Sequence, residues 1–316
     1  MITYQDVLAA QQRIAPHILR TPLLRVPALD AVLGCQVYLK PESLQKTGSF
    51  KIRGATNAML CLTDAQKQNG IVGSSSGNHA QGVACAAKLL GIDAVVVMPE
   101  NANPVKLAGT KAYGAKVLLA GTLASERDAK ADELVRQEGR TLIHPYSNDH
   151  VRAGQGTVAV EILQDAPDID TLVVPVGGGG LLSGIATAAK AMRPGIRVVG
   201  VEPTGAPRYS ASREAKRPVW LEQVDTIADG TRTDHADPDN FETIERLVDA
   251  LVAVTDADIR AAMRLAALSA KIVAEPSSSM TIAAALSKRL AVRPEEKVCF
   301  VISGGNIDPA LLKEVL

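Results

Sequence analysis

The sequence predicts an α/β fold with parallel, twisted sheets, and two observations carry this prediction. Short β-branched runs alternate with longer Ala-rich stretches of helical character along the 316 residues. The β-branched runs are continuously apolar, which is typical of strands that helices cover on both faces. The length suffices for two domains, although no Pro/Gly-rich linker marks a boundary between them.

The expected elements follow one another in strand–helix order. We expect strands at residues 36–40, 70–76, 94–99, 115–120, 141–145, 171–177, 196–202 and 297–305. We expect helices near residues 54–62, 78–90, 104–112, 123–138, 152–165, 181–192, 257–272 and 278–290. Asn103 and Pro104 suit the cap and the first position of one helix. The charged stretch 203–245 lacks such patterning, and we expect a long surface excursion there.

Composition limits the class of ligand. Hydrophobic residues make up 47% of the chain, and aromatics only 3%, so Ala, Val, Leu and Ile must build the core. The 34 Lys and Arg residues balance the 34 Asp and Glu residues. No excess of positive charge therefore points to nucleic acid or to an anionic membrane surface. We expect a small-molecule substrate and neither a nucleic-acid nor a membrane partner.

The cysteines and the N-terminus predict a cytoplasmic protein. Cys35, Cys61, Cys85 and Cys299 have neither CxxC spacing nor a paired histidine pattern, so we expect reduced, mostly buried thiols. The N-terminus has no apolar signal-peptide core. No apolar run is long enough to span a bilayer.

Three loops of small residues follow expected strands, and they indicate a polar or anionic ligand. They read "SSSGNHAQG", "VGGGGLLSG" and "ISGGNIDP". In parallel sheets, ligands bind where such loops gather at the carboxyl ends of the strands. Small residues leave the backbone N–H groups of these loops free of side-chain obstruction.

The run Gly177 to Gly180 is suited to phosphate, because consecutive N–H groups at a helix start can point at one anion. The alternative is a tight strand-to-helix turn with a packing role. No Gly-Lys-Ser/Thr follows, which excludes a Walker A motif. Glu202 ends the next strand, where a ribose-binding acid is expected, so an NAD-dependent oxidoreductase stays open as an alternative of another class. A catalytically silent sensor of a phosphate ligand is a further alternative.

Lys51 lies in the segment "LQKTGSFKIRGA", between an aromatic residue and an isoleucine. Partial desolvation and the nearby cations Lys46 and Arg53 are expected to lower the pKa of its amine, which favours a nucleophile. The alternative is a basic surface cluster that precedes a helix.

These segments give the chain a family resemblance. The motifs that carry it are "TPLL", "VYLKPESLQKTGSFKIRGA", "SSSGNHAQGVA", "YGAK", "AGQGTVAVEIL", "VPVGGGGLLSGI", "ETIERLVD", "AEPSSSM" and "ISGGNID". The chain resembles fold-type II enzymes dependent on pyridoxal 5′-phosphate, in the branch of threonine/serine dehydratases and serine racemases. The resemblance implies a tryptophan-synthase-β-like fold. It also implies a large cofactor-binding domain at residues 1–69 and 148–316 and a small substrate-loop domain at 70–147.

The resemblance assigns expected roles in binding the cofactor. Lys51 would form the internal Schiff base, with Phe50 packed beside the ring, Asn78 at the ring hydroxyl and Glu275 near the ring. The phosphate would be held by Gly177, Gly178, Gly179, Gly180 and Leu181. Ser303 would face the pyridine nitrogen. A hydroxyl there cannot hold a protonated pyridinium as an aspartate would, which suits β-elimination and disfavours transamination.

A substrate loop is also implied, made of Ser75, Ser76, Gly77, Asn78 and His79, whose N–H groups would take the substrate carboxylate. Ser76 matches the serine that faces the lysine in racemases; alternatively it is only a helix N-cap. His79 is expected to be a packed residue at a helix start rather than a proton carrier. Arg127 is either a solvated helix charge or, as in racemase and 3-hydroxyaspartate-lyase relatives, a contact to the substrate's side chain.

Two further positions depart from the family pattern. Relatives bind Mg²⁺ or another divalent ion with an acid at the position of Glu202, a carbonyl at that of Ala206, and a second acid where this chain has Arg208. We expect no metal here, and a pairing of Arg208 with Glu202 instead. Ser278 and Ser279 replace small apolar residues; they either cap a helix or add polar contacts near the cofactor.

The expected function is β-elimination of water from L-threonine and/or L-serine, giving a 2-oxo acid and ammonia. Lys51 would be the base that removes the α-proton. A serine racemase or a 3-hydroxyaspartate ammonia-lyase of the same fold is the alternative within the family. We expect a homodimer or a homotetramer.

Overall fold

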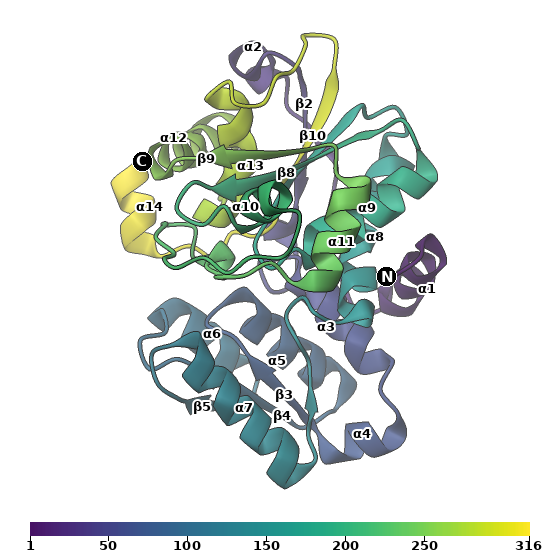
Figure 1. Cartoon of the computed structure of the whole chain (residues 1–316), viewed down its shortest axis with the longest axis vertical. Helices are drawn as coiled ribbons and strands as arrows, with labels where there is room; N and C mark the ends of the chain where they lie inside the picture. The colour runs from purple at the N-terminus through teal and green to yellow at the C-terminus, as the bar shows by residue number, and fades with distance from the viewer.

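The computed structural model describes residues 1–316, and two mainly parallel sheets organise it (Figure 1). The larger sheet has the strand order β1-β2-β10-β7-β8-β9, and only β1 is antiparallel to its neighbour. Its strands are β1 Leu24–Arg25, β2 Gln36–Pro41, β7 Thr171–Pro175, β8 Arg197–Pro203, β9 Ala250–Val254 and β10 Lys297–Ile302. The smaller, fully parallel sheet has the order β5-β4-β3-β6. Its strands are β3 Ile71–Ser74, β4 Ala94–Met98, β5 Lys116–Leu119 and β6 Thr141–Leu142.

Helices cover both faces of each sheet. The α-helices are α1 Tyr4–Ile14, α2 Asp30–Leu33, α3 Lys51–Leu60, α4 Asp64–Asn69, α5 Asn78–Leu90, α6 Pro104–Ala112, α7 Ala124–Glu138, α8 Asp149–Asp165, α9 Gly180–Met192, α10 Arg208–Ala215, α11 Pro238–Leu247, α12 Asp256–Leu265, α13 Pro276–Leu286 and α14 Pro309–Val315. The short helices are the 3₁₀ turns η1 Pro27–Leu29, η2 Glu42–Leu44 and η3 Asp229–Thr231, and the π-helical turn η4 Ala266–Ala270. None of them combines the length and hydrophobicity that a membrane-spanning helix needs.

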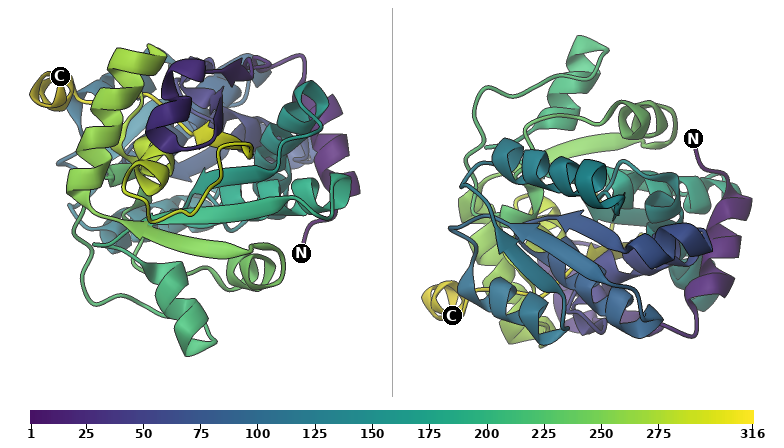
Figure 2. Two further views of the ribbon diagram at one scale, coloured as in Figure 1. Left: turned by 90° about the horizontal axis from the view of Figure 1, so that it is seen from above. Right: turned by 90° about the horizontal axis from the view of Figure 1, so that it is seen from below.

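The core around the larger sheet lies on both of its faces, as the continuous apolar strands predicted. Along β7, Leu172 and Val174 belong to the core cluster that includes residues of α8 and α9, whereas Val173 belongs to the cluster that includes residues of α12 and α13. Figure 2 shows these helix layers from above and the smaller sheet from below. On the smaller sheet, α3 and α5 cover one face and α7 covers the other. The α/β prediction is thereby confirmed, while the domain boundaries stay a prediction.

The eight expected strands are all present, but the prediction for residues 203–245 was only partly right. The segment between α10 and α11 is irregular except for η3, whereas the rest of the stretch contains α10 and most of α11, and Arg208 and Tyr209 of α10 are fully buried. Charged and turn-forming residues hid the helical pattern, because α10 is buried through polar contacts rather than through an apolar stripe. The strands β1 and β9 were also missed. The helix expected at 257–272 ends at Leu265 and continues as the π-helical turn η4.

Candidate active site

One cavity of about 1120 Å³ collects the loops that follow the strands of both sheets. Ser75 follows β3, Gly177 follows β7 and Ser303 follows β10, so the cavity lies at the carboxyl ends of parallel strands. Every site residue predicted from the sequence lines it. These are Phe50, Lys51, Ser75, Ser76, Gly77, Asn78, His79, Arg127, Gly177, Gly178, Gly179, Gly180, Leu181, Glu275 and Ser303. The volume is large enough for a cofactor together with a small substrate.

Lys51 is the first residue of α3, and its amine lies in this cavity. Lys51 Nζ donates to the carbonyl of Pro145 at 2.9 Å and lies 5.2 Å from the centre of the Phe50 ring. Removal of the amine from water lowers its pKa to about 8, and the Glu275 carboxylate opposes this shift. The amine is thus about half neutral near pH 8 and becomes largely neutral about one pH unit higher. The alternative of a basic surface cluster is wrong.

The expected cause of this lowered pKa was only half right, since desolvation accounts for it and the neighbouring cations do not. Lys46 Nζ is exposed and donates to the carbonyl of His17. Arg53 is buried against Glu42 and Glu161, so carboxylates neutralise its charge. Neither cation contributes to the shift of Lys51.

The loop from Gly177 to Leu181, which we call the glycine cradle, forms the turn between β7 and α9. None of its five backbone N–H groups donates to another group of the chain. Its carbonyls are fixed on the other side, since that of Gly178 accepts from Tyr209 Oη at 2.9 Å and from Asn240 Nδ2 at 2.8 Å. Free N–H groups at a helix start are what a phosphate requires.

The glycines of the cradle are also required by packing. Gly179 has φ +89°, in the left-handed region. A Cβ at Gly178 would overlap the ring of Tyr146, and a Cβ at Gly179 would overlap the hydroxyl of Tyr209. The two interpretations of this run are therefore compatible, because the same glycines make a tight turn and leave a ring of free donors.

A chain of polar contacts joins two of the predicted ring-binding residues. Asn78 Nδ2 donates to Glu275 Oε1 at 2.6 Å, and Asn306 Nδ2 donates to Asn78 Oδ1 at 2.9 Å. Glu275 Oε2 is buried without a hydrogen-bond partner, and Lys106 Nζ lies 4.0 Å from it. Burial raises the pKa of Glu275, and the charge of Lys106 opposes this rise. An unpartnered carboxylate oxygen next to the cleft is a group that a ligand can satisfy.

The substrate loop lies at the start of α5. Gly77 is the N-cap residue of this helix and no side chain caps it, so the interpretation of Ser76 as a helix N-cap is wrong. Ser76 is instead exposed to the cavity. His79 is buried, and its Nε2 donates to the carbonyl of Ile143 at 2.7 Å. Burial and the charge of Lys51 lower the pKa of His79 to about 3, so the imidazole is neutral.

Arg127 is not a solvated helix charge. Its side chain is only 16% exposed, and its Nε donates to Ser74 Oγ at 2.8 Å. Its guanidinium lies 3.6 Å from Asp128, on the α7 wall of the cavity. One edge of the guanidinium is thus fixed at the wall that a bound substrate would face.

The expected direct pairing of Arg208 with Glu202 is wrong. Glu202 accepts from the N–H groups of Tyr209 and Ser210, each at 2.8 Å. Arg208 donates instead to the carbonyls of Gly177 at 2.8 Å and Ala206 at 2.5 Å. Backbone N–H groups of α10 therefore satisfy the carboxylate of Glu202. Burial raises the pKa of Glu202, and the charge of the nearby Arg208 guanidinium opposes this rise. The structure contains no cluster of three or more His, Cys, Asp or Glu side chains that could hold a metal.

Several cavity residues were missed from the sequence, among them Pro145, Tyr146 and Lys106. Pro145 accepts from Lys51, and Tyr146 lies against the glycine cradle. Both follow β6, so the strand-end rule that found the other loops would have found them. Lys106 pairs with Asp229, a partner 123 residues away that no spacing pattern indicates.

The chain is similar over almost its whole length to several known enzymes. The family described as "Pyridoxal-phosphate dependent enzyme" matches residues 14–304. A serine racemase of Oryza sativa subsp. indica is 41% identical over 98% of this chain and 93% of its own length. An L-threonine ammonia-lyase of Thermotoga maritima is 42% identical over 100% of this chain and 78% of its own length. The solved structure of maize serine racemase superposes with a TM-score of 0.95 at 38% identity, covering 99% of this chain and 96% of that one.

Proposed function

Since the chain belongs to the family of pyridoxal-phosphate-dependent enzymes, in the branch of threonine dehydratases and serine racemases, we propose that it is an ammonia-lyase. It would eliminate water from L-threonine, L-serine or both, giving a 2-oxo acid and ammonia. One observation carries the proposal: a single cavity holds an amine of lowered pKa, five free backbone N–H groups and a serine hydroxyl. The NAD-dependent and sensor alternatives leave the amine without a role.

The residues of the cavity fit the cofactor. When bound, pyridoxal phosphate supplies an electron sink for the charge left on a substrate's Cα after proton loss. Lys51 would hold the cofactor through its amine. The glycine cradle would bind the phosphate, Phe50 would pack beside the ring, and Asn78 would bind the ring hydroxyl.

Ser303 supports elimination rather than transamination. It is buried, follows β10 and lines the cavity, and it would hold the nitrogen of the ring. A neutral hydroxyl cannot stabilise a pyridinium charge as a carboxylate would. A weaker electron sink favours prompt loss of a β-leaving group over a long-lived carbanion.

Lys51 also supports the proposed proton transfers. With cofactor and substrate bound, the neutral Nζ of Lys51 would accept the α-proton of the substrate. It can then return this proton to the departing β-hydroxyl, which leaves as water. The N–H groups of the substrate loop, residues 75–79, would hold the carboxylate of the substrate at the helix start.

Two residues favour a second candidate within the same branch. Ser76 exposes its hydroxyl to the cavity, where a group opposite Lys51 could return a proton to the other face of Cα and so racemise serine. Arg127 presents a fixed guanidinium, which suits a β-carboxylated substrate such as 3-hydroxyaspartate. We further expect a cytoplasmic homodimer or homotetramer.

A substrate panel tests these assignments. L-Threonine, L-serine, D-serine and 3-hydroxyaspartate are each incubated with the holoenzyme, and both 2-oxo acid release and enantiomer exchange are followed. Release of 2-oxo acid from threonine or serine supports the lyase. Exchange that exceeds release, and that Ser76→Ala abolishes while release persists, would make racemisation the main activity.

A further inference from the structure

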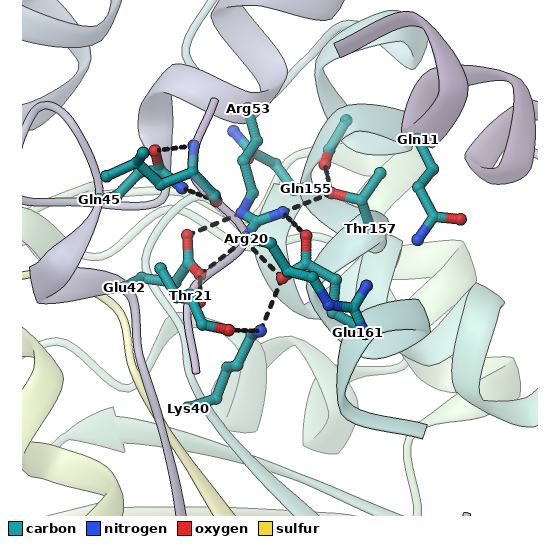
Figure 3. Close-up of polar contacts among 12 residues, drawn as sticks. Gln11, Arg20, Thr21, Lys40, Glu42, Gln45, Arg53, Gln155, Thr157 and Glu161 are labelled. Carbon is teal, nitrogen blue, oxygen red and sulfur yellow. Dashed lines mark hydrogen bonds and ion pairs between the residues drawn. The ribbon is translucent and has the colours of Figure 1, made fainter. Parts of the chain in front are cut away.

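Four fully or almost fully buried charges form a network beneath the start of α3, and the proposed function gives them no role. These residues, which we call the buried charge network, are Lys40 and Glu42 near the end of β2, Arg53 of α3 and Glu161 of α8 (Figure 3). Two cations balance two carboxylates, so the network carries no net charge.

Arg53 is the centre of this network. Its Nε and Nη2 donate to the two oxygens of Glu42 at 2.7 and 2.8 Å. Its Nη1 and Nη2 donate to the two oxygens of Glu161 at 2.7 and 2.9 Å. The fifth N–H donates from Nη1 to Thr157 Oγ1 at 3.1 Å. All five donors of the guanidinium are satisfied, and two bidentate contacts fix its plane.

Lys40 and Thr21 close the network. Lys40 Nζ donates to Glu161 Oε2 at 2.6 Å and to the carbonyl of Thr21 at 2.7 Å. The hydroxyl of Thr21 donates to Glu42 Oε1 at 2.6 Å. Stability alone does not explain such a cluster, because well-packed apolar residues often replace buried ion pairs without loss of stability. Apolar residues could not fix the orientation of a side chain in this way. The two carboxylates fix the orientation of the Arg53 guanidinium and hence the position of α3, the helix that carries it.

Through α8, the network connects the start of α3, which carries Lys51, with the glycine cradle. Arg53 lies two residues after Lys51, so its position limits where α3 begins. Glu161 and Thr157 belong to α8, which packs against α3 so closely that a Cβ at Gly154 would lie 2.7 Å from the carbonyl of Arg53. On its other side, α8 meets α9, where a Cβ at Gly156 would lie 2.7 Å from the carbonyl of Gly184. The helix α9 begins at the glycine cradle.

We propose that Arg53, held by Glu42 and Glu161, is a positioning residue that fixes Lys51 relative to the glycine cradle. Backbone contacts without intervening side chains transmit a displacement of one helix directly to the next. The network sets the position of α3 on α8, and α8 sets that of α9. The distance between amine and phosphate site thus depends on four charges that touch neither ligand. This inference rests on the proposed attachment of the cofactor to Lys51.

The test compares two ligands on the full chain. Pyridoxal 5′-phosphate would use the cradle, the ring contacts and a bond to Lys51, whereas pyridoxamine 5′-phosphate has no aldehyde and would use only the cradle and the ring contacts. In Glu161→Gln we expect pyridoxal phosphate to bind about tenfold to a hundredfold more weakly, by analogy with the losses found when outer-shell partners of metal ligands are removed. Pyridoxamine phosphate should bind as in the wild type. The matched control is Asp165→Asn, one turn along α8 in the exposed pair with Arg20, and it should change neither affinity.

The outcomes separate the possible roles. Equal weakening for both ligands in Glu161→Gln, or unchanged affinity for both, would overturn the positioning role. If Glu161→Gln does not fold, Thr157→Val removes one hydrogen bond to Arg53 without changing any charge. It should weaken pyridoxal phosphate selectively, and an unchanged ratio of the two affinities in this variant would also overturn the role. A wild-type chain that does not bond pyridoxal phosphate at all would instead contradict the proposed function.

Discussion

The hydroxyl oxygens of Ser278 and Ser303 lie 3.1 Å apart in a buried pair. Ser278 Oγ also donates to the carbonyl of Gly304 at 2.6 Å and accepts from the N–H of Gly304 at 2.7 Å. Because the only proton of Ser278 goes to this carbonyl, Ser303 is the donor within the pair. Ser278 therefore holds the hydroxyl of Ser303, and it makes these polar contacts instead of capping its helix, whose N-cap residue is Glu275. That these contacts lie near the cofactor stays a prediction.

We predict that Ser278→Ala destabilises the protein by about 1–3 kcal/mol, because it leaves the buried N–H of Gly304 without an acceptor. Thermal unfolding of the variant and the wild type measures this loss. Ser279→Ala is the matched control, since Ser279 Oγ bonds only the carbonyl of Glu275 within its own helix. A fall in stability that is equal in the two variants would contradict the role given to Ser278.

The glycine cradle gives a second prediction. Gly178→Ala places a methyl group in the ring of Tyr146, and we expect a stability loss of about 1–3 kcal/mol from overpacking. The displaced N–H groups should also weaken the binding of pyridoxamine 5′-phosphate, measured by calorimetry. Gly195→Ala is the control, because nothing lies within 4 Å of its added Cβ. Unchanged phosphate-ligand affinity in Gly178→Ala would contradict the cradle.

The lowered pKa of Lys51 predicts how cofactor attachment depends on pH. Folding lowers the pKa of this amine from 10.5 to about 8, so the folded chain holds a neutral amine above about pH 8. The rate at which the cofactor-free chain bonds pyridoxal phosphate should rise through pH 8 and level off above it. Stopped-flow absorbance measures this rate. Free Nα-acetyl-lysine, which keeps its ε-amine, is the reference for titration of the cofactor itself.

The sign for stability follows from the same shift. Between pH 8 and 10.5 the unfolded chain binds a proton at this amine that the folded chain does not, so this group makes stability rise with pH in that window.

Lys46→Met separates desolvation from the effect of neighbouring cations, because Lys46 points away from the site. A rate midpoint that moves upward in Lys46→Met would show that neighbouring charge lowers the pKa of Lys51 after all.

Arg127 should determine the preference for the substrate's side chain. If its guanidinium binds a β-carboxylate, Arg127→Met should raise KM for 3-hydroxyaspartate by about tenfold to a hundredfold, the range of a hydrogen bond to a charged group. KM for threonine should change little. Arg136→Met on the exposed face of the same helix is the control. Equal KM changes for both substrates would contradict this assignment.

Local signals explain which elements could be predicted from the sequence. The helices α5 and α6 were predicted with their correct bounds, since Gly91 ends the first and the Asn103 cap with Pro104 begins the second. In α10, Arg208 is buried by carbonyls of a distant loop, which no periodicity reveals.

The site shows the same contrast between local motifs, which the sequence reveals, and long-range contacts, which only the fold creates. Its loops are local motifs at strand ends, so every residue that the sequence assigned to the site lines the cavity, although other lining residues such as Tyr146 and Lys106 were missed. The buried charge network was not predicted, because Arg53 and Glu161 are 108 residues apart and only the fold brings them together. Sequence spacing even suggested the opposite role for Arg53, that of an unpaired cation beside Lys51.

Identifying the lysine that carries the cofactor is the sharpest test of the proposed function. Lys51 and Lys106 are the two lysines that line the cavity. Burial alone would lower the pKa of Lys106, but the carboxylates of Glu275 and Asp229 outweigh burial and raise it, so Lys106 stays charged. Reduction of the holoenzyme with borohydride, followed by peptide mass spectrometry, should find the cofactor on Lys51 alone. A label on Lys106, or no label on any lysine, would contradict the account.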